Sequence, residues 1–344
     1  MKILIISDAW HPQINGVVRT YEYIKQELEK MGHDVRVLGP ADFPWRLPMP
    51  GYSEIKLALF PYAYLEKLTR EFGPDYIHLA TEGPLGWAGR KYCARNNIIF
   101  SSSYHTHFPD YMARRIRKFL PFLARPVHEI AKRWVRKFHA PSRGLMLATA
   151  SLEQELKDWG FKAPIFRLSR GVLTEQFYPG EKTLFKDLPK PIAIYVGRVA
   201  IEKSIEDFLE MPWTGSKIVV GDGPELQELK TKYPSAIFTG SKTGAELGAH
   251  YRSADVFVFP SRTDTFGMVL IEALASGLPV AAYNVTGPKD IITEPFLGVL
   301  NDNLSLAALE AMKQGAAQQR SEYAKTHYTW EHAARQFMIA AQNR

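Results

Sequence analysis

Short apolar runs alternate along the chain with longer segments in which apolar side chains recur every three to four positions. The apolar runs of the first half predict strands at residues 2–7, 34–38, 76–79, 98–101, 145–148 and 164–168. The segments between them predict helices at residues 17–31, 61–72, 85–95 and 151–159. Residues 40–54 are rich in proline and predict irregular structure. Because strands that alternate with helices form parallel sheets, the first half predicts an α/β domain with a doubly wound parallel sheet.

The second half repeats this alternation. Its apolar runs predict strands at residues 192–196, 217–220, 236–239, 256–259, 278–283 and 299–300. Helices are predicted after residue 203, after the turn at 221–225 with Pro224 near the first helical position, and at residues 245–251, 268–275, 305 onward and 329–342. The loop-like stretch 169–184 predicts a linker. The expected organisation is two Rossmann-like domains that face a central cleft, formed by residues 1–168 with 329–344 and by residues 185–328.

Length and composition fit this organisation. A chain of 344 residues is long enough for two hydrophobic cores. Its one cysteine, Cys93, excludes a disulfide framework and a cysteine metal cluster and suits a reducing compartment. The N-terminal apolar run is too short for a signal peptide, and no window approaches the length of a transmembrane helix. A cytoplasmic location is therefore expected.

The positive charge is concentrated in one segment. The net charge of the chain is +7. Between residues 114 and 137 one acid, Glu129, accompanies nine basic residues, Arg114, Arg115, Arg117, Lys118, Arg125, Lys132, Arg133, Arg136 and Lys137. Aromatic residues, among them Phe119, Phe122 and Trp134, lie between these basic residues. The basic excess is therefore expected to serve a local purpose.

Two prolines, Pro121 and Pro126, are expected to divide this basic segment into two helical pieces. Apolar residues at helical spacing predict one apolar face, made of Val127, Ile130, Trp134 and Phe138. Two interpretations remain open: an amphipathic helix docked on its own domain, and a helix that lies on an anionic membrane surface. A nucleic-acid partner is disfavoured, because no nucleic-acid-binding motif accompanies the charge.

The strongest candidate for a ligand site is the segment 260–277, which follows the predicted strand at 256–259. Glu272 lies inside an otherwise apolar helix, and Asp264 lies in the loop before that helix. A buried carboxylate is costly unless something binds it. Two carboxylates can accept hydrogen bonds from vicinal hydroxyl groups, as in a ribose or a hexose. The pattern therefore predicts a site for such a ligand.

Groups that suit a diphosphate follow other predicted strands. Arg198 and Lys203 lie beside Gly197, at the start of a helix. Thr265, Phe266, Gly267 and Met268 begin the helix of Glu272, whose free N–H groups can meet anionic or hydroxyl oxygens. Gly221 and Gly223 form a tight turn that a flat ring could approach. Ordinary solvated charges and turns remain alternatives for the cations and for the glycines.

In the first domain, Gly16 and Val17 form a glycine-bearing loop that enters a helix and is compatible with a phosphate. It lacks the G-x-G-x-x-G pattern, so an ordinary turn is the alternative. His105 and His107 follow the strand at 98–101 and could line a cleft, serve a structural role or bind a metal. No D-x-D pattern occurs, so no metal is suggested, and cations and helix N-termini would stabilise a leaving diphosphate.

The chain resembles the glycosyltransferase family 4 enzymes of GT-B fold over essentially its full length. The motifs that carry the resemblance are P-x-x-N-G-V-V at 12–18, Y-H-T-H-F-P at 104–109, A-T-A-S-L at 148–152, R-G-V at 170–172, Y-V-G-R-V-A-I-E-K at 195–203, G-D-G-P-E at 221–225, P-S-R-T-D-T-F-G-M-V-L-I-E-A-L-A-S-G-L-P-V at 260–280 and V-x-G-P-x-D at 285–290. The resemblance implies retention at the anomeric carbon without an obligatory metal or other cofactor. It also implies that the C-terminal helix after Trp330 crosses back to the first domain.

The resemblance assigns a role to each matching residue. It implies that Arg198 and Lys203 bind the donor diphosphate, that Glu272 binds the ribose, and that the loop at Gly16 closes over the phosphates. Asp264 would face the donor sugar together with the backbone at 266–268, and His105 would point into the cleft near sugar and acceptor. Asp264 stands where the family usually has Glu, Ser204 where Gly is common, and Leu173 where Asp often follows R-G-V. These departures leave the identity of the sugar open.

The expected function is transfer of a hexose or hexuronic acid from a nucleotide diphosphate sugar, with UDP favoured, to a membrane lipid such as diacylglycerol. The resemblance to lipid glycosyl-, glucuronosyl- and sulfoquinovosyl-transferases supports a lipid acceptor. The basic segment supports a peripheral position on the inner face of the cytoplasmic membrane. The open alternatives are a GDP-mannose-dependent mannosyltransferase acting on a lipid or glycan, a nucleotide-sugar epimerase, and a nucleotide-sugar-binding protein without catalysis.

Overall fold

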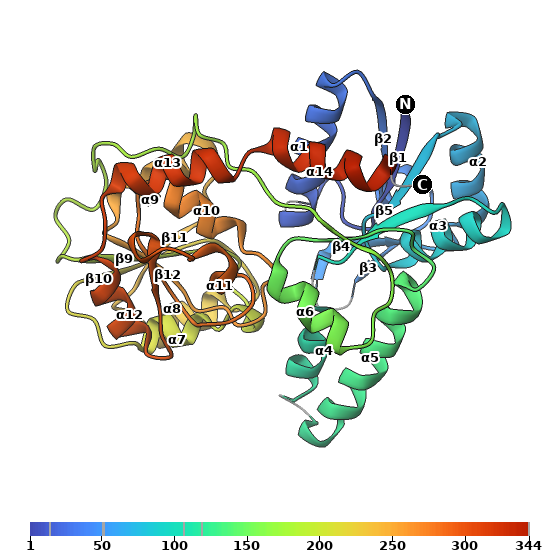
Figure 1. Ribbon diagram of the computed structural model, residues 1–344. Helices are drawn as coiled ribbons and strands as arrows, with labels where there is room; N and C mark the ends of the chain where they lie inside the picture. Colours follow the sequence, from blue (N-terminus) through green and yellow to red (C-terminus); the bar gives the residue numbers. More distant parts are fainter. Residues whose placement is uncertain (14, 50–51, 106, 118–119, 343–344) are drawn as a thin grey trace. The chain divides into compact units, whose positions relative to one another are not determined.

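The computed structural model describes residues 1–13, 15–49, 52–105, 107–117 and 120–342, without the side chains of residues 49, 52–55, 111, 114 and 115. The chain divides into two compact units. The first unit contains Met1–Thr106, Pro126–Arg170 and Trp330–Arg344, and the second contains His107–Arg125 and Gly171–Thr329. Each unit is built around its own parallel sheet of six strands, as the sequence predicts (Figure 1).

The sheet of the first unit has the order β2-β1-β5-β6-β7-β8, and all its described pairings are parallel. Its strands are β1 (Lys2–Ile6), β2 (Asp34–Leu38), β5 (Tyr76–Leu79), β6 (Phe100–Ser103), β7 (Leu145–Leu147) and β8 (Ile165–Arg167). Because the chain crosses from one side of β1 to the other between β2 and β5, the loops after β1 and β5 lie at a topological switch point. Such points commonly hold the ligand in open α/β sheets.

Helices complete this unit: α1 (Gly16–Lys30), α2 (Tyr62–Phe72), α3 (Pro84–Arg95), α5 (Ala124–His139), α6 (Ala150–Asp158) and α14 (Trp330–Gln342). The C-terminal helix α14 packs beside α1, as Figure 1 shows. Tyr23 of α1 stacks on Trp330, with ring centroids 4.8 Å apart. The last helix is therefore part of the first unit.

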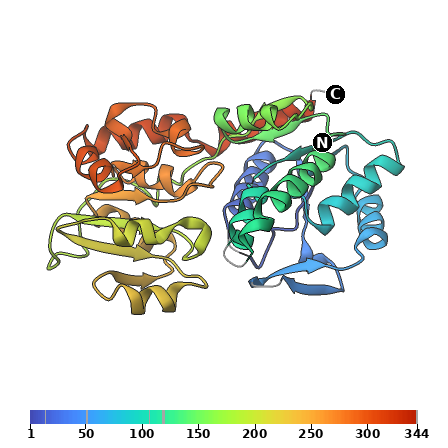
Figure 2. The same cartoon turned by 90° about the horizontal axis from the view of Figure 1, so that it is seen from below.

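The prediction of irregular structure at residues 40–54 was wrong. A short 3₁₀ helix, η1 (Pro40–Asp42), leads into an antiparallel ribbon of β3 (Arg46–Met49) and β4 (Tyr52–Ala58). Figure 2 shows this ribbon in light blue, apart from the six-stranded sheet. Proline cannot donate a hydrogen bond to a central strand, but a two-stranded ribbon has only edge strands. Pro48 of β3 is therefore compatible with a strand.

The sheet of the second unit has the order β11-β10-β9-β12-β13-β14 and is also parallel. Its strands are β9 (Ile192–Val196), β10 (Ser216–Val220), β11 (Ile237–Gly240), β12 (Val256–Phe259), β13 (Val280–Ala282) and β14 (Gly298–Leu300). In order of appearance this is 3-2-1-4-5-6, the Rossmann order. The switch point lies between β9 and β12, so the loops that follow these two strands meet at one edge of the sheet.

The helices of the second unit are α4 (Phe108–Arg117), α7 (Ile205–Glu210), α8 (Leu226–Lys232), α9 (Gly244–Ser253), α10 (Met268–Ala275), α11 (Pro288–Ile291), α12 (Leu304–Ala311) and α13 (Ala317–His327). Three 3₁₀ turns, η2 (Pro121–Leu123), η3 (Ile201–Lys203) and η4 (Pro295–Leu297), connect them. Pro224 lies two residues before α8, which starts at Leu226, and the backbone at 221–225 is hydrogen-bonded to the loop after β9.

Helix α5 differs from its prediction in two ways. Pro126 does not break the helix, because it is the third helical residue, where no carbonyl of the preceding turn needs its missing N–H. The predicted apolar face is divided. Phe138 is buried, together with Ala131 and Val135, whereas Ile130 is 64% and Trp134 36% exposed. The helix is docked on its own unit, and part of its apolar surface stays in solvent.

Candidate functional site

In the second unit, the loops after β9 and β12 are joined at the switch point. Lys203 Nζ lies 2.5 Å from Asp264 Oδ1, and Thr263 Oγ1 donates to the carbonyl oxygen of Glu202 at 3.2 Å. The side chains of Lys203 and Asp264 keep 26% and 19% of their surface exposed. Two predicted site residues from distant parts of the sequence are thus brought into direct contact.

Two opposing effects act on the pKa of Asp264. Burial raises it, but the nearby ammonium of Lys203 and the hydrogen bond from that group outweigh burial, so the pKa lies below its usual value. Asp264 is therefore ionised at neutral pH. Its Oδ1 holds Lys203, while its Oδ2 is buried and makes no hydrogen bond within the described part of the chain. A buried carboxylate oxygen of this kind can accept a hydrogen bond from a hydroxyl group.

The glycines of the loops after β9 and β10 let two backbones approach closely. A Cβ at Gly221 would lie 1.8 Å from the carbonyl oxygen of Gly197, and a Cβ at Gly223 would lie 2.2 Å from that of Val199. Val199 N donates to the carbonyl oxygen of Asp222 at 2.9 Å. Glycine is thus needed at these positions because the two loops pack backbone against backbone. This packing fixes the backbone next to Arg198.

Helix α10 carries the predicted carboxylate in its buried interior. It begins after Gly267, which has a left-handed φ of 88°. Glu272 is 3% exposed, and its Oε2 accepts a hydrogen bond from the hydroxyl of Tyr251 in α9 at 3.0 Å. Sequence reasoning missed Tyr251, because an aromatic residue at helical spacing is usually a core residue. Thr265 and Phe266, in the loop before α10, are also buried.

In the first unit, the predicted phosphate loop begins α1 with its own cap. Asn15 Oδ1 accepts hydrogen bonds from the backbone N–H groups of Val17 and Val18, both at 3.0 Å. Two of the N–H groups that could meet a phosphate are therefore already occupied. The exposed Gly16 is the first residue of the helix.

His105, after β6, belongs to a polar network in the first unit. Its Nε2 lies 2.8 Å from the hydroxyl of Tyr21, and its Nδ1 lies 2.9 Å from an Nη of Arg170. The Tyr21 hydroxyl also lies 2.8 Å from His78 Nε2 and donates to Ser103 Oγ at 2.9 Å. Tyr21, His78, Ser103 and Arg170 are all buried. Sequence reasoning missed this network, because its members lie on α1, β5, β6 and the segment after β8.

This network fixes the protonation state of His105. An arginine can only donate, so Nδ1 must accept, and the ring proton of a neutral imidazole is then on Nε2, where it is donated to Tyr21. Burial, and next the charge of Arg170, hold the pKa of His105 well below its usual value. His105 is thus a neutral histidine with both nitrogens bonded inside its own unit, which suits positioning better than acid–base chemistry.

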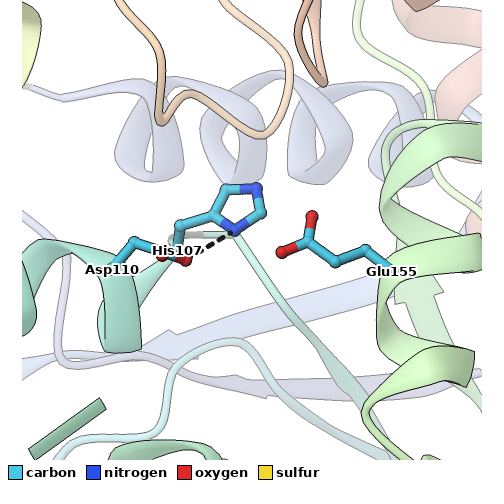
Figure 3. Close-up of side chains that lie close together, drawn as sticks. All are labelled: His107, Asp110 and Glu155. Carbon is cyan, nitrogen blue, oxygen red and sulfur yellow. Dashed lines mark ion pairs between the residues drawn. The ribbon is translucent and has the colours of Figure 1, made fainter. Parts of the chain in front are cut away.

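The other candidate histidine, His107, lies directly before α4. Figure 3 shows its ring beside Asp110, with Nδ1 and Oδ2 3.6 Å apart. This distance allows an ion pair if the ring is protonated, but it is long for a hydrogen bond.

The basic segment is only partly described. Lys118 and Phe119 and the side chains of Arg114 and Arg115 lie outside the described residues. Arg117, Arg133 and Phe122 are exposed, and Phe122 keeps 73% of its surface in solvent. Lys132 is half-buried and lies over the ring of Trp159, with its Nζ 5.1 Å from the centroid. No helix among the described residues is long and apolar enough to cross a membrane.

Family models and individual relatives both place the chain among the glycosyltransferases. A family model described as "Glycosyltransferase Family 4" matches residues 14–176, and one described as "Glycosyl transferases group 1" matches residues 190–314. A GDP-mannose-dependent alpha-mannosyltransferase of Mycobacterium tuberculosis is 31% identical over 87% of this chain and 83% of its own length. A protein with the same description from Corynebacterium glutamicum is 29% identical over 88% of this chain and 77% of its own length.

Two further similarities extend this result. An alpha-monoglucosyldiacylglycerol synthase of Streptococcus pneumoniae is 29% identical over 91% of this chain and 78% of its own length. Among solved structures, a sucrose-phosphate synthase of Thermosynechococcus elongatus superimposes with a TM-score of 0.75 at 20% identity, covering 98% of this chain and 97% of that one. This likeness shows the fold alone. The sheet orders, the family models and the identity to the mannosyltransferases agree: the chain belongs to glycosyltransferase family 4 and is a nucleotide-sugar-dependent glycosyltransferase of GT-B fold.

Proposed function

We propose that the protein transfers mannose from GDP-mannose to a lipid acceptor at a membrane surface. The similarity to the mannosyltransferase of Mycobacterium tuberculosis, across 87% of this chain, carries the donor part of this proposal. It favours the alternative that the sequence left open over the expected UDP-linked donor. Retention at the anomeric carbon, without an obligatory metal, is part of the same proposal.

The donor would bind along the carboxyl edge of the second sheet. Arg198 and Lys203 would hold the diphosphate and stabilise it as it leaves, and Glu272 would accept hydrogen bonds from the ribose hydroxyls. The close packing of Gly221 on Gly197 and of Gly223 on Val199 supports this role, because it fixes the backbone beside the diphosphate site.

The sugar would lie against Asp264 and the backbone of residues 265–268. Since Oδ1 of Asp264 is bonded to Lys203, Oδ2 would accept a hydrogen bond from a sugar hydroxyl. The ion pair between Asp264 and Lys203 would also connect the two parts of the donor site, because Asp264 would bind the sugar and Lys203 the diphosphate. At the start of α1 in the first unit, a phosphate could bind the amide of Val17 only in place of Asn15.

A membrane lipid as the acceptor follows from α5 and from the relatives. Ile130 and Trp134 remain exposed next to Arg133 and Lys137 in sequence, a combination of aromatic, aliphatic and basic groups that favours an anionic bilayer surface. The exposed Phe122 and Arg117 would add to this contact. The protein would then be peripheral, on the inner face of the cytoplasmic membrane.

A second candidate is transfer of glucose from UDP-glucose to diacylglycerol. The similarity to the alpha-monoglucosyldiacylglycerol synthase over 91% of this chain favours it. The two candidates share the second-unit site and differ in nucleotide base and sugar.

The test is a panel of GDP-mannose, GDP, UDP-glucose, UDP-galactose, UDP-glucuronic acid and UDP in a thermal-shift assay. A ligand present at about 100 times its Kd adds roughly 2.7 kcal/mol to the free energy of unfolding. Stabilisation by GDP-mannose and GDP alone is expected. Stabilisation by UDP and UDP-glucose, with none from the guanine nucleotides, would replace the first candidate by the second.

A further inference from the structure

The β3–β4 ribbon of the first unit exposes its apolar face. Alternate residues of a strand point to opposite faces, and Ala58, which is 1% exposed, fixes which face meets the unit. The opposite face carries the pair Leu47 and Leu57, followed by Trp45 and Leu59, whose backbones are joined by a hydrogen bond of 2.8 Å. The usual pattern, with apolar residues inward and polar residues outward, is therefore reversed in this ribbon.

The exposure of these side chains is large. Trp45 is 71% exposed, Leu47 56% and Leu59 37%, and the next residue, Phe60, is 93% exposed. Phe60 also has a left-handed φ of 46°, which is unfavourable for a residue with a bulky side chain. The fold thus holds an aromatic side chain in solvent at a cost and gains no packing from it. Contiguous apolar surface of this kind commonly marks an interaction site.

The exposed charged side chains that the structure describes on the ribbon are basic, and by strand alternation they lie on the face of Ala58. Arg46 and Lys56 lie on the ribbon and are exposed, and neither forms an ion pair within the described part of the chain. Lys91 and Arg95 of α3 are exposed and lie over the ring of Tyr62, two residues after Phe60, at 4.7 and 5.0 Å from its centroid.

Exposed basic residues elsewhere differ, because many pair with an acid one helical turn away. Examples are Lys30 with Glu27, Arg70 with Glu66, Lys157 with Glu153, Lys313 with Glu310 and Arg335 with Glu331. The four cations beside the ribbon make no such pairs among the residues described, so their charge is available to an anionic partner. Aromatic residues beside unpaired Lys and Arg are typical of protein surfaces at the membrane–water interface.

We propose that the β3–β4 ribbon inserts its apolar face, led by Trp45 and Phe60, into the interface of an anionic lipid bilayer. Arg46, Lys56, Lys91 and Arg95 bind the lipid headgroups around it. This contact is made by other elements than the contact proposed for α5, and it gives the enzyme a second membrane anchor. The inference rests on the proposed lipid acceptor.

A fluorescent label at the tip tests the insertion directly. The variant Phe60→Cys is labelled with an environment-sensitive NBD group. The native Cys93 should not react, because it is fully buried and burial raises the pKa of its thiol to about 12. The matched control is Ile339→Cys on α14 of the same unit, where the native side chain is 59% exposed. Vesicles of phosphatidylcholine alone and with phosphatidylglycerol are added to the full chain.

With vesicles that contain phosphatidylglycerol, NBD fluorescence at position 60 should shift to the blue and rise. The label at position 339 should show neither change. Loss of Trp45 in Trp45→Ser should weaken vesicle binding about tenfold, as for loss of a buried aromatic side chain. Replacing Arg46 and Lys56 by Gln should weaken it about fivefold each. No shift at position 60 with any vesicle would overturn the proposal. A shift that grows with protein concentration alone would assign the ribbon to a second copy of the chain and would also overturn it.

The same preparation separates this inference from the proposed function. All of these substitutions lie in the first unit, so the thermal shift with GDP-mannose should be unchanged. Insertion of the ribbon without transfer to lipid would contradict the proposed acceptor and leave the ribbon proposal intact. Transfer to lipid with no insertion at position 60 would contradict the ribbon proposal alone.

Discussion

The buried carboxylate of Glu272 offers the sharpest test of the donor site. If it accepts hydrogen bonds from the ribose, Glu272→Gln should remove the preference of the protein for ribonucleotides over deoxyribonucleotides. Gln has nearly the same volume and can still accept from Tyr251, so the fold is kept. A hydrogen bond to a charged group contributes about 1.5–3 kcal/mol, or roughly 10- to 150-fold in affinity. The native protein should therefore bind GDP at least about tenfold more tightly than 2′-deoxy-GDP.

Isothermal titration with the two nucleotides measures this ratio directly. In Glu272→Gln the ratio should fall close to one, mainly because GDP binds more weakly. Tyr251→Phe should give an intermediate ratio, since the carboxylate keeps its charge but loses the hydrogen bond of 3.0 Å that orients it. The matched control is Tyr233→Phe in the same unit, which removes a tyrosine–carboxylate hydrogen bond to Glu210 at the surface.

The control variant should keep the native ratio. An unchanged ratio in Glu272→Gln, with a normal unfolding transition, would refute the assignment of Glu272 to the ribose. A ratio near one in the native protein would refute it as well.

Three further outcomes are expected. Asp264→Asn should lower kcat/KM for GDP-mannose at least about tenfold but not weaken GDP binding, since a charged hydrogen bond to the sugar is lost; weaker GDP binding would contradict this. Arg170→Met should raise the pKa of the His105 imidazole, because the charge of Arg170 lowers it, but burial, the larger cause, should keep the pKa below its usual value. Titration followed by ¹⁵N NMR should also show a change of tautomer, since Nδ1 loses the hydrogen bond from Arg170, and Arg170→Lys should restore the native spectrum. Below pH 6.5 the free energy of unfolding should fall by about 1.4 kcal/mol per pH unit for each of His105 and His78. Burial lowers the pKa of His78 to about 3 and holds that of His105 well below its usual value, so only the unfolded state takes up these two protons. Below pH 6, Asp8, whose pKa burial raises to about 6, should offset one of the two, and urea unfolding at pH 7, 6 and 5 measures the sum.

The parallel sheets could be predicted because their strands are buried on both faces. Four strands, at 34–38, 76–79, 192–196 and 256–259, and the helix at 268–275 were predicted with the observed bounds. An apolar run of four or five residues between turn signals leaves little freedom in where such a strand starts and ends. The ribbon at 46–58 could not be predicted in this way, since its alternation is reversed and interrupted by proline.

The candidate site was predicted where its residues are close in sequence and missed where they are not. Asp264 and Glu272 belong to one continuous segment. Tyr251 lies 21 residues before Glu272 and Arg170 lies 65 residues after His105, so only the folded chain brings each pair together. The faces of α5 were assigned wrongly for a related reason. Helical spacing places Ile130, Trp134 and Phe138 near one another but does not determine which of them meets the sheet.

Transfer of mannose to lipid is tested most directly by one measurement. The full chain is incubated with vesicles that contain diacylglycerol and phosphatidylglycerol and with either GDP-[¹⁴C]mannose or UDP-[¹⁴C]glucose, and the label extracted into organic solvent is counted. Label should appear from GDP-mannose and should fall about 10²- to 10³-fold in Arg198→Ala, which lacks a charged contact to the leaving diphosphate. Lipid label from UDP-glucose alone, or no lipid label from either donor, would contradict the proposed function.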